Sequence, residues 1–174
     1  MGAQPIMHEN PVSEVSVRLF CAGDEKDFRR LNEAWIAKYF GIEGKDEETF
    51  ADPQHKIIEA GGQIFLALVD GIAVGTVGLR RMPGKVHSYE LIKMATDENY
   101  QRRGIARAVV QAAVKWAKQQ GARRLYLETN HTLTPAITLY ESVGFKHMPP
   151  QPTPYKRADV FMEMWMEPEW VKYI

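Results

Sequence analysis

The feature that most constrains this chain is a mostly apolar strand that leads through a short polar loop into an amphipathic helix. The strand is predicted at Ser88–Thr96, the loop at 97–103 and the helix at about 104–120. Apolar side chains recur along the helix, for example at Ile105 and Val109, with a spacing that places them on one face. That face must pack against other apolar structure, so the segment predicts a fold of the mixed α/β class.

The rest of the sequence predicts further strands and helices on both sides of this segment. In chain order we expect a strand at 15–19, a helix at 24–40, an acidic irregular stretch at 41–52, a short helix at 53–60, a hairpin of strands at 63–69 and 72–81, the segment described above, a strand at 124–129, a helix at 134–143, and strands starting at 145 and spanning 159–166. Asp24 is expected to cap the first helix, and Thr134 the last, where Pro135 follows.

The length and composition of the chain predict a single domain. The chain has 174 residues, of which 45% are hydrophobic and 25% charged, as in an ordinary globular protein with a real core. We expect a loose polar arm at 1–13 and one domain at 14–174. The Pro-rich stretch 149–154 is too short to separate two domains, so it is predicted to be a hairpin loop.

The balance of charges and the single cysteine limit the classes of function. Lys and Arg number 22, and Asp and Glu also number 22, so the basic excess that is typical of nucleic-acid binding is missing. Cys21 stands alone, and the 5 histidines show no metal-binding spacing, so no metal site is expected. No apolar run approaches the ~18–20 residues of a membrane span, and 1–11 has no signal-peptide core. We expect a cytoplasmic protein without nucleic-acid or membrane partners.

The loop before the helix at 104–120 has the composition of an anion site. A helix N-terminus leaves backbone N–H groups unpaired, and its dipole favours negative charge. Gly104 lets a ligand approach the backbone closely, and Arg102 and Arg103 add positive charge. These residues indicate a pyrophosphate site, but they are equally compatible with a solvated helix start. Neither of the two common glycine-rich phosphate-loop patterns is present.

The hexapeptide Q-R-R-G-I-A at 101–106 resembles the Q/R-x-x-G-x-G/A motif of the GNAT family of acyl-CoA N-acetyltransferases. The stretch 139–145 has the ending L-Y-E-x-x-G-F, which is typical of the same family. The order of the predicted elements also agrees, so the resemblance covers the chain from Val15 to Met166. Ala106 stands where glycine is more usual, and the family pattern accepts alanine.

The resemblance implies a GNAT-like fold, in which a central mixed and mostly antiparallel sheet is flanked by helices and splays open at the cofactor site. Acetyl-CoA, as co-substrate, would lie in this opening, with its pyrophosphate on the backbone amides of 102–107 and its pantetheine arm beside 94–96. The residues that the resemblance assigns to the cofactor are Met94, Ala95, Thr96, Gln101, Arg102, Arg103, Gly104, Ile105, Ala106, Arg107, Asn130, Ala136 and Tyr140. For Asn130, a plain strand-end turn is the alternative.

The transfer of an acetyl group to an amine needs a base and benefits from an acid. An alkyl ammonium group has a pKa near ~10, so a proton must be removed before the nitrogen attacks. Glu90, in an otherwise apolar strand, is the candidate base, because burial raises the pKa of a carboxyl group. An ion pair with Lys93 or an arginine, or a chain of waters as the base, are the alternatives. The resemblance makes Tyr140 the acid beside the CoA sulfur, whereas its helical spacing with Ala136 and Val143 favours core packing.

The resemblance places the acceptor site at the first helix and the acidic stretch after it. Glu33, Tyr39 and Glu43 are the candidate residues, with Asp46 and Glu47 in the same region, because an acidic wall attracts a cationic amine. A solvated charged loop is the alternative interpretation. Glu128 alternates with Leu127 on the strand at 124–129 and is expected to face solvent.

These residues together predict an N-acetyltransferase that moves an acetyl group from acetyl-CoA to a primary amine of a small molecule or protein, by direct attack in a ternary complex. A catalytically weak CoA-binding regulatory module is the alternative function, which the presence of both Tyr140 and Glu90 disfavours. A protein that docks nucleic acid through its arginines is disfavoured by the net charge of +0. A homodimer is suggested only by the family resemblance.

Overall fold

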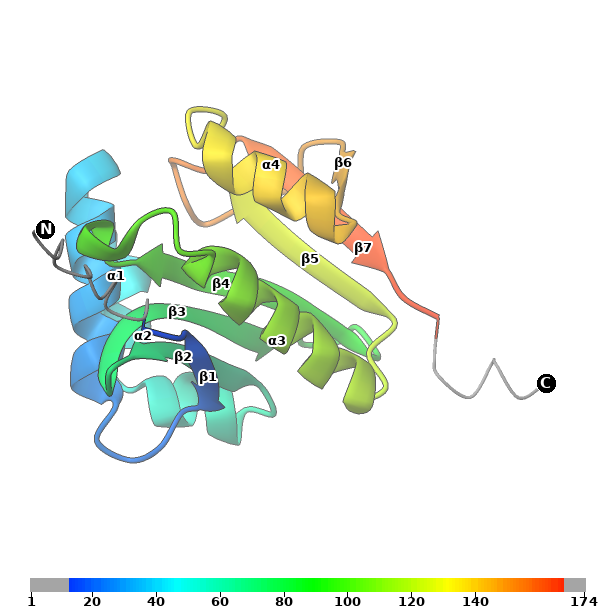
Figure 1. Ribbon diagram of the computed structural model, residues 1–174. Helices are drawn as coiled ribbons and strands as arrows, with labels where there is room; N and C mark the ends of the chain where they lie inside the picture. The colour runs from blue at the N-terminus through cyan, green and yellow to red at the C-terminus, as the bar shows by residue number, and fades with distance from the viewer. Residues whose placement is uncertain (1–12, 168–174) are drawn as a thin grey trace, which may run out of the picture.

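A central sheet of seven strands runs through residues 13–167, the part of the chain that the computed structural model describes (Figure 1). The strands lie in the order β1-β2-β3-β4-β5-β7-β6, and all neighbours are antiparallel except β4 and β5, which are parallel. Their bounds are β1 Ser16–Leu19, β2 Gln63–Val69, β3 Ile72–Arg81, β4 Ser88–Thr96, β5 Arg124–Thr129, β6 Lys146–Met148 and β7 Val160–Trp165. The predicted mixed and mostly antiparallel sheet is confirmed.

Helices cover both faces of this sheet, α3 and α4 on one side and α1, α2 and η1 on the other (Figure 1). Their bounds are α1 Glu25–Tyr39, α2 Gly44–Ala51, the π-helical η1 Gln54–Glu59, the 3-10 turn η2 Glu98–Tyr100, α3 Ile105–Gln119 and α4 Thr134–Val143. Buried apolar side chains form a cluster on each side, one around Val109 and Leu125 and the other around Phe28 and Ile64. Because the sheet is covered on both faces, its central strands have no broad solvent-facing side.

The parallel strands β4 and β5 separate beyond their first residues. They pair over 88–91 of β4 and 124–127 of β5, after which β4 continues to Thr96 without a described partner on that side. In the same region β4 shifts its register against β3, and Lys93 adopts a φ of 53°. A bulge of this kind bends a strand and interrupts its pairing. The structure therefore has the opening in the sheet that the family resemblance implied.

Helix α3 begins directly over the sheet. A Cβ atom at Gly75 of β3 would clash with the side chain of Ile105, so this glycine allows the first turn of α3 to approach the strand. Ile105 and Val109 of the predicted apolar stripe are buried, and Val110 and Ala113, which were not predicted, are buried beside them. The helix N-terminus is thereby held next to the end of β4.

Sequence reasoning misplaced the region after α1. The stretch 41–52, predicted to be irregular, contains helix α2. The side chain of Glu43 accepts a hydrogen bond from the third helical residue, Asp46, whose own side chain accepts one from the backbone of Glu43. This reciprocal capping box stabilises a helix start that an apolar pattern alone does not reveal.

Neither of the two predicted cap side chains caps its helix. Asp24 occupies the N-cap position of α1, as predicted, but its side chain binds Arg18 and the backbone N–H of Cys21 instead of the helix. Thr134 is the first residue of α4 rather than its cap, since Leu133 occupies the cap position. The expected arm at 1–13 lies outside the described residues except for Ser13, and residues 168–174 are outside as well.

Candidate active site

A cavity of about 110 Å³ lies where β4 and β5 separate. Its walls come from both helical layers, from the two strands and from the loop between β6 and β7. The lining residues are Asn32, Trp35, Ile36, Phe40, Glu90, Leu91, Ile92, Lys93, Met94, Glu128, Thr129, Asn130, Leu133, Ala136, Tyr140, Tyr155, Arg157 and Ala158. One cavity is therefore bordered by side chains from both faces of the sheet.

Tyr140 lies on the α4 side of this cavity. Its side chain is buried, its ring packs edge-on against Phe145, and its hydroxyl lies 3.6 Å from the sulfur of Met94. Burial raises the pKa of Tyr140, so the hydroxyl keeps its proton at neutral pH. Met94 and Ala136 line the same wall. The structure thus brings together three of the predicted cofactor residues, with one O–H donor among them.

Gly104 forms the turn between β4 and α3. It has a φ of 70° and a ψ of 21°, a left-handed conformation that glycine adopts without strain. No atom lies within 4 Å of the position that a Cβ would take, so the approach to the N-terminus of α3 is open. Arg103 stacks over the ring of Tyr100 at 5.3 Å, and Arg107 donates a hydrogen bond to Ser142 of α4 at 2.9 Å.

The remaining residues predicted to hold the cofactor fall into two groups. Gln101, Arg102 and Ala106 lie at or near the surface around Gly104. Ala95 and Ile105 are buried in the two apolar clusters, so only their backbone groups can face a ligand. Thr96 ends β4 and pairs with Gly75 of β3.

Asn130 follows β5 directly and lines the cavity. Its side-chain NH₂ donates to the carbonyl of Arg157 at 2.7 Å, and its side-chain oxygen accepts from the backbone and hydroxyl of Thr132 at 2.9 and 2.6 Å. The amide therefore shapes the strand-end turn and holds the loop between β6 and β7. This is the structural role that sequence reasoning had given as the alternative.

Glu90 lies in the paired part of β4, directly beside Arg80 of β3, and its carboxylate forms an ion pair with that arginine. The side chain of Glu90 is only 10% exposed. Burial raises the pKa of Glu90, and the charge and hydrogen bond of Arg80 oppose this increase without cancelling it. The ion pair that sequence reasoning considered is present, with Arg80 as the partner rather than Lys93.

Glu128 does not simply face solvent, because it lines the cavity beside the opening between the strands. It comes directly after Leu127, the last β5 residue that pairs with β4. Its two carboxylate oxygens accept hydrogen bonds from the hydroxyls of Tyr126 at 3.0 Å and Thr153 at 2.5 Å. Within the described residues no cation pairs with it. The prediction from alternation failed because the face of β5 that carries Glu128 is covered by the loop between β6 and β7, which contains Thr153.

Helix α1 supplies the wall opposite Tyr140, but not through the residues that were predicted. Asn32, Trp35 and Ile36 line the cavity, whereas Glu33 and Tyr39 do not. Glu33 binds Arg29 one turn away along the helix, and Tyr39 is 46% exposed. The sequence does contain a signal for this wall, since Trp35 and Ile36 belong to the apolar stripe of the helix.

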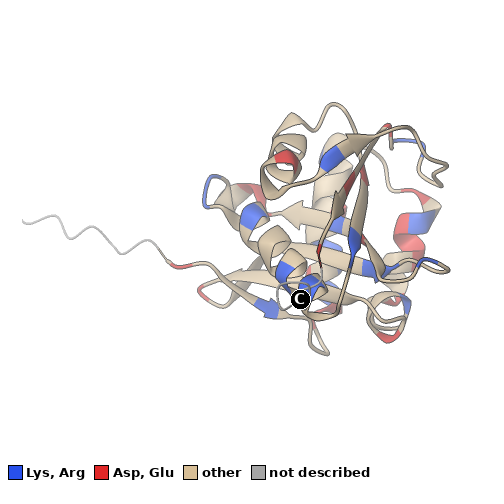
Figure 2. Cartoon of the chain, turned by 90° about the vertical axis from the view of Figure 1, so that its right-hand side faces the viewer, with Lys and Arg blue, Asp and Glu red and all other residues tan. Residues whose placement is uncertain are grey.

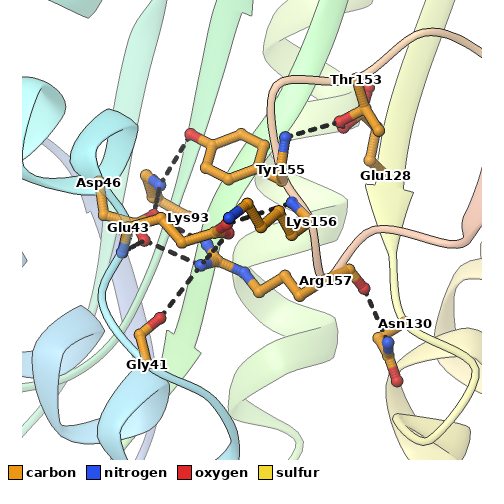
Figure 3. A network of polar contacts seen from close by, with 10 residues as sticks. All are labelled: Gly41, Glu43, Asp46, Lys93, Glu128, Asn130, Thr153, Tyr155, Lys156 and Arg157. Atoms are coloured by element: carbon orange, nitrogen blue, oxygen red, sulfur yellow. Dashed lines mark hydrogen bonds and ion pairs between the residues drawn. The ribbon is translucent and has the colours of Figure 1, made fainter.

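Five residues that we call the Asp46 cluster lie at the end of the cavity next to α2: Lys93, Tyr155 and Arg157, which line the cavity, and Glu43 and Asp46, which bind them. Figure 3 shows Arg157 and Tyr155 reaching from the loop between β6 and β7 toward α2 and β4. Arg157 holds Asp46 with both terminal nitrogens, at 2.8 and 2.9 Å, and Glu43 at 3.0 Å. Lys93 forms an ion pair with Asp46 and donates to the hydroxyl of Tyr155 at 3.2 Å.

The charges of the Asp46 cluster depend on one another because the cluster is buried. The side chain of Asp46 is 0% exposed and that of Lys93 is 6% exposed. Burial works against the ionised form of Asp46, but the bonds from Arg157 and Lys93 outweigh it and lower its pKa to about 2. Burial lowers the pKa of Lys93, and Asp46 opposes this change. Sequence reasoning placed Glu43 at the acceptor site but did not connect it to this cluster.

Residues 28–145 match the sequence profile of the acetyltransferase (GNAT) family. This match covers more than half of the chain, including the opening, the Gly104 turn and Tyr140. The chain belongs to the GNAT family. The family resemblance of the motif at 101–106 is thereby confirmed.

Several GNAT relatives are similar to this chain in part. An N-alpha-acetyltransferase of Sulfurisphaera tokodaii is 35% identical over 94 residues, which are 48% of this chain and 56% of that protein. An N-acetylaspartate synthetase of Rattus norvegicus is 30% identical over 95 residues, 55% of this chain and 31% of that protein. The chain thus spans about half of the length of the first relative and about a third of the second.

Solved GNAT structures share the fold. An acetyltransferase of the family from Staphylococcus aureus superimposes with a TM-score of 0.80 at 19% identity, covering 88% of this chain and 100% of that one. The PaiA N-acetyltransferase of Thermoplasma acidophilum, solved in complex with coenzyme A, reaches 0.71 at 17% identity, with 88% and 99% covered. At these identities the likeness shows the fold alone.

The described residues show no strong charge asymmetry. Lys and Arg side chains are interspersed with Asp and Glu in the view of Figure 2. Within 13–167, no helix is long and apolar enough to cross a membrane. The same part of the chain holds no group of three side chains arranged to bind a metal ion.

Proposed function

We propose that this GNAT protein transfers an acetyl group from acetyl-CoA to a primary amine, by direct attack within a ternary complex. One observation carries the proposal. The cavity at the opening of the sheet has a protonated hydroxyl, Tyr140, on the α4 side and two carboxylates, Glu90 and Glu128, on the strands that flank it. An acid for the leaving group and a base for the nucleophile thus border the same space.

Acetyl-CoA would approach over the N-terminus of α3 and enter the opening along β4. Its pyrophosphate fits the open space over Gly104, where the helix presents unpaired N–H groups. Its pantetheine arm fits beside 94–96, where β4 has no described neighbour on the β5 side. Met94 and Ala136 then border the thioester, and Tyr140 lies next to its sulfur.

In the transfer, the amine nitrogen must lose two protons and the departing sulfur must gain one. The ammonium loses one proton to a carboxylate, its nitrogen attacks the thioester carbon, and the carbonyl oxygen becomes an oxyanion that the free edge of β4 can stabilise through backbone N–H groups. As the C–S bond breaks, the nitrogen gives up its second proton, and the departing sulfur takes one. Tyr140 is the donor beside that sulfur, and it regains its proton from the amine side.

The two carboxylates differ as proton acceptors. Glu90, which the sequence analysis named as the base, is shared with Arg80, although its pKa is raised by burial. Within residues 13–167, the side-chain partners of Glu128 are hydroxyl groups, and it lies where β4 and β5 separate. We therefore extend the proposed role of Glu90 to the pair, with Glu128 taking the proton first and Glu90 behind it.

The names of the relatives support an α-amino group as the acceptor. Two archaeal relatives are N-alpha-acetyltransferases, and three vertebrate relatives are N-acetylaspartate synthetases. The first name denotes a protein N-terminus and the second an amino acid.

The lone cysteine, Cys21, is a free and exposed thiol, which suits a cytoplasmic location.

The purified full chain tests this function with acetyl-CoA and a panel of primary amines, with release of the CoA thiol as the measurement. Direct attack predicts intersecting initial-rate lines when both substrates are varied, and a protein mass without an added acetyl group. Parallel lines with an acetylated chain would instead indicate a covalent route, for which Cys21→Ser is the control. Binding of acetyl-CoA without turnover of any amine would favour the regulatory module.

A further inference from the structure

The two cations that line the cavity are already neutralised by carboxylates of the chain. Lys93 and Arg157 both bind Asp46, and Arg157 also binds Glu43. The oxygens of Asp46 are used fully, because they also accept the backbone N–H of Glu43 at 2.8 Å. A ligand carboxylate that bound Arg157 or Lys93 would compete for it with a carboxylate that is fully buried. Loss of the cation would leave that buried negative charge without its partner.

The carboxylates that line the cavity are not balanced in the same way. Glu90 is paired with Arg80, whereas Glu128 has the hydroxyls of Tyr126 and Thr153 and no cation among the described residues. The cavity therefore has one uncompensated negative charge. It attracts an ammonium group and repels a carboxylate at the same place.

The wall around the acceptor end is apolar and aromatic. Trp35, Ile36 and Phe40 line it from the α1 side, with the rings of Trp35 and Phe40 centred 6.1 Å apart. Tyr155 faces them from the loop between β6 and β7, and its ring carries the guanidinium of Arg157 at 4.8 Å. Aromatic surfaces of this kind gain free energy when they cover an apolar group.

We infer that the acceptor is an amine that has an apolar substituent next to its nitrogen and no carboxylate beside it. This is the chemistry of a peptide α-amine with an apolar first residue, in which the carboxyl group is converted to an amide. The inference rests on the proposed acetyl transfer and specifies its acceptor. Glu128 receives the ammonium, the aromatic wall receives the apolar substituent, and the Asp46 cluster withholds its cations from any carboxylate.

Three amines separate these features, with the wild-type full chain and acetyl-CoA. Phenylalaninamide has the amine and the ring, phenylalanine adds a carboxylate, and glycinamide lacks the ring. The comparison is made at a pH above the pKa of all three amines, so that differences in protonation do not contribute. We expect kcat/KM for phenylalaninamide to exceed that for each of the other two by ~10-fold or more.

Two variants assign the preferences to their residues. Trp35→Ala should reduce the ratio of phenylalaninamide to glycinamide, while the ratio of phenylalaninamide to phenylalanine stays the same. Asp46→Asn should reduce the second ratio, because it releases Arg157 and Lys93 to bind a carboxylate. The wild-type ratios decide the inference even if a variant does not fold.

The possible results separate the inference from the function it rests on. Phenylalanine or aspartate used as well as phenylalaninamide would overturn the inference and leave the acetyl transfer standing. Glycinamide used as well as phenylalaninamide would overturn the role of the aromatic wall. No CoA release with any amine, while acetyl-CoA still raises the melting temperature, would remove the proposed function and the inference with it.

Discussion

The two sides of the opening in the sheet are built in different ways. On the side proposed for acetyl-CoA, which we call the cofactor side, the end of β4, the turn at Gly104 and the start of α3 follow one another in the chain, and the surface is mostly backbone. On the side proposed for the amine, which we call the acceptor side, the Asp46 cluster joins three separate segments through ion pairs. The cofactor side thus depends on local backbone geometry, and the acceptor side on contacts between distant side chains. One side can therefore change without altering the other.

The sharpest test of this separation is Gly104→Glu, which should abolish acetyl-CoA binding. It places a negative charge over the helix N-terminus and forces a non-glycine residue into a left-handed conformation. In the wild type, acetyl-CoA at ~100 times its Kd should add ~2.7 kcal/mol of stability, which a thermal shift detects. Gly104→Asn is the matched control, since asparagine tolerates this conformation and adds no charge.

A retained thermal shift in Gly104→Glu would contradict the placement of the pyrophosphate. The acceptor side should keep its structure in this variant, which a normal melting temperature without ligand would show. If the unliganded protein were strongly destabilised, the two sides would be less independent than their construction indicates.

The next largest effect concerns the two carboxylates between the sides. Glu128→Gln should lower kcat by ~10²–10⁴ at neutral pH, and Glu90→Gln by a smaller factor, because Arg80 already shares the charge of Glu90. Both losses should shrink as the pH rises and more of the amine is unprotonated. Steady-state kinetics across pH, with acetyl-CoA binding as the control, measure this. A larger loss for Glu90→Gln than for Glu128→Gln would show that Glu90, not Glu128, takes the first proton.

Asp46→Asn should disrupt the acceptor side alone. This change leaves Lys93 and Arg157 buried without their shared carboxylate, which should lower the free energy of unfolding by ~3–5 kcal/mol. Chemical denaturation measures the loss, and Glu48→Gln on the exposed side of α2 is the matched control. Equal stability of the two variants would show that the cluster does not hold the acceptor side together.

The same cluster makes stability depend on acid. Because the pKa of Asp46 is about 2 in the folded protein, against an ordinary value of 3.8, its ionised form stabilises the fold above the ordinary value. That contribution, about 2 kcal/mol, should disappear as the pH falls through this interval. Denaturation curves between neutral pH and ~2 should show the loss in the wild type and lack this component in Asp46→Asn.

The smallest effect is expected at Tyr140, on the cofactor side. Tyr140→Phe should lower kcat by ~10-fold while stability and acetyl-CoA affinity change little, because the hydroxyl contacts only the sulfur of Met94 among described residues. An acyl thioester with a thiol of lower pKa should reduce the loss. Kinetics and the melting temperature separate the outcomes, and unchanged kcat with a lowered melting temperature would make Tyr140 a core residue only.

The sequence predicts the cofactor side well because its determinants are local. The bounds predicted for β4 and β5 agree with the structure, and α3 starts within one residue of the expected position. Gly104 has the left-handed turn that a glycine at this position suggests. Helix α2 was missed because its only large apolar residue is Phe50 and its stability depends on the capping pair Glu43 and Asp46.

The acceptor side shows what a single sequence does not contain. Lys93 lies 47 positions and Arg157 111 positions from Asp46 along the chain, and no periodicity of the sequence links the three residues. Glu128 was mispredicted for a related reason. Its alternation with Leu127 was correctly recognised, but its face of β5 is covered by the distant loop between β6 and β7, from which Thr153 binds it.

The bulge at Lys93 reverses the alternation of side chains along β4. Leu91 points to the α3 layer and Ile92 to the α1 layer, as in a regular strand, and Lys93 then also reaches the α1 and α2 side. From there Met94 returns to the α4 side and Ala95 to the other. In a strand with the same residues and no bulge, regular alternation would turn Met94 to the α1 side and Ala95 to the α3 and α4 side. This single bulge thus decides which side chains of β4 line each side of the opening, without altering any residue.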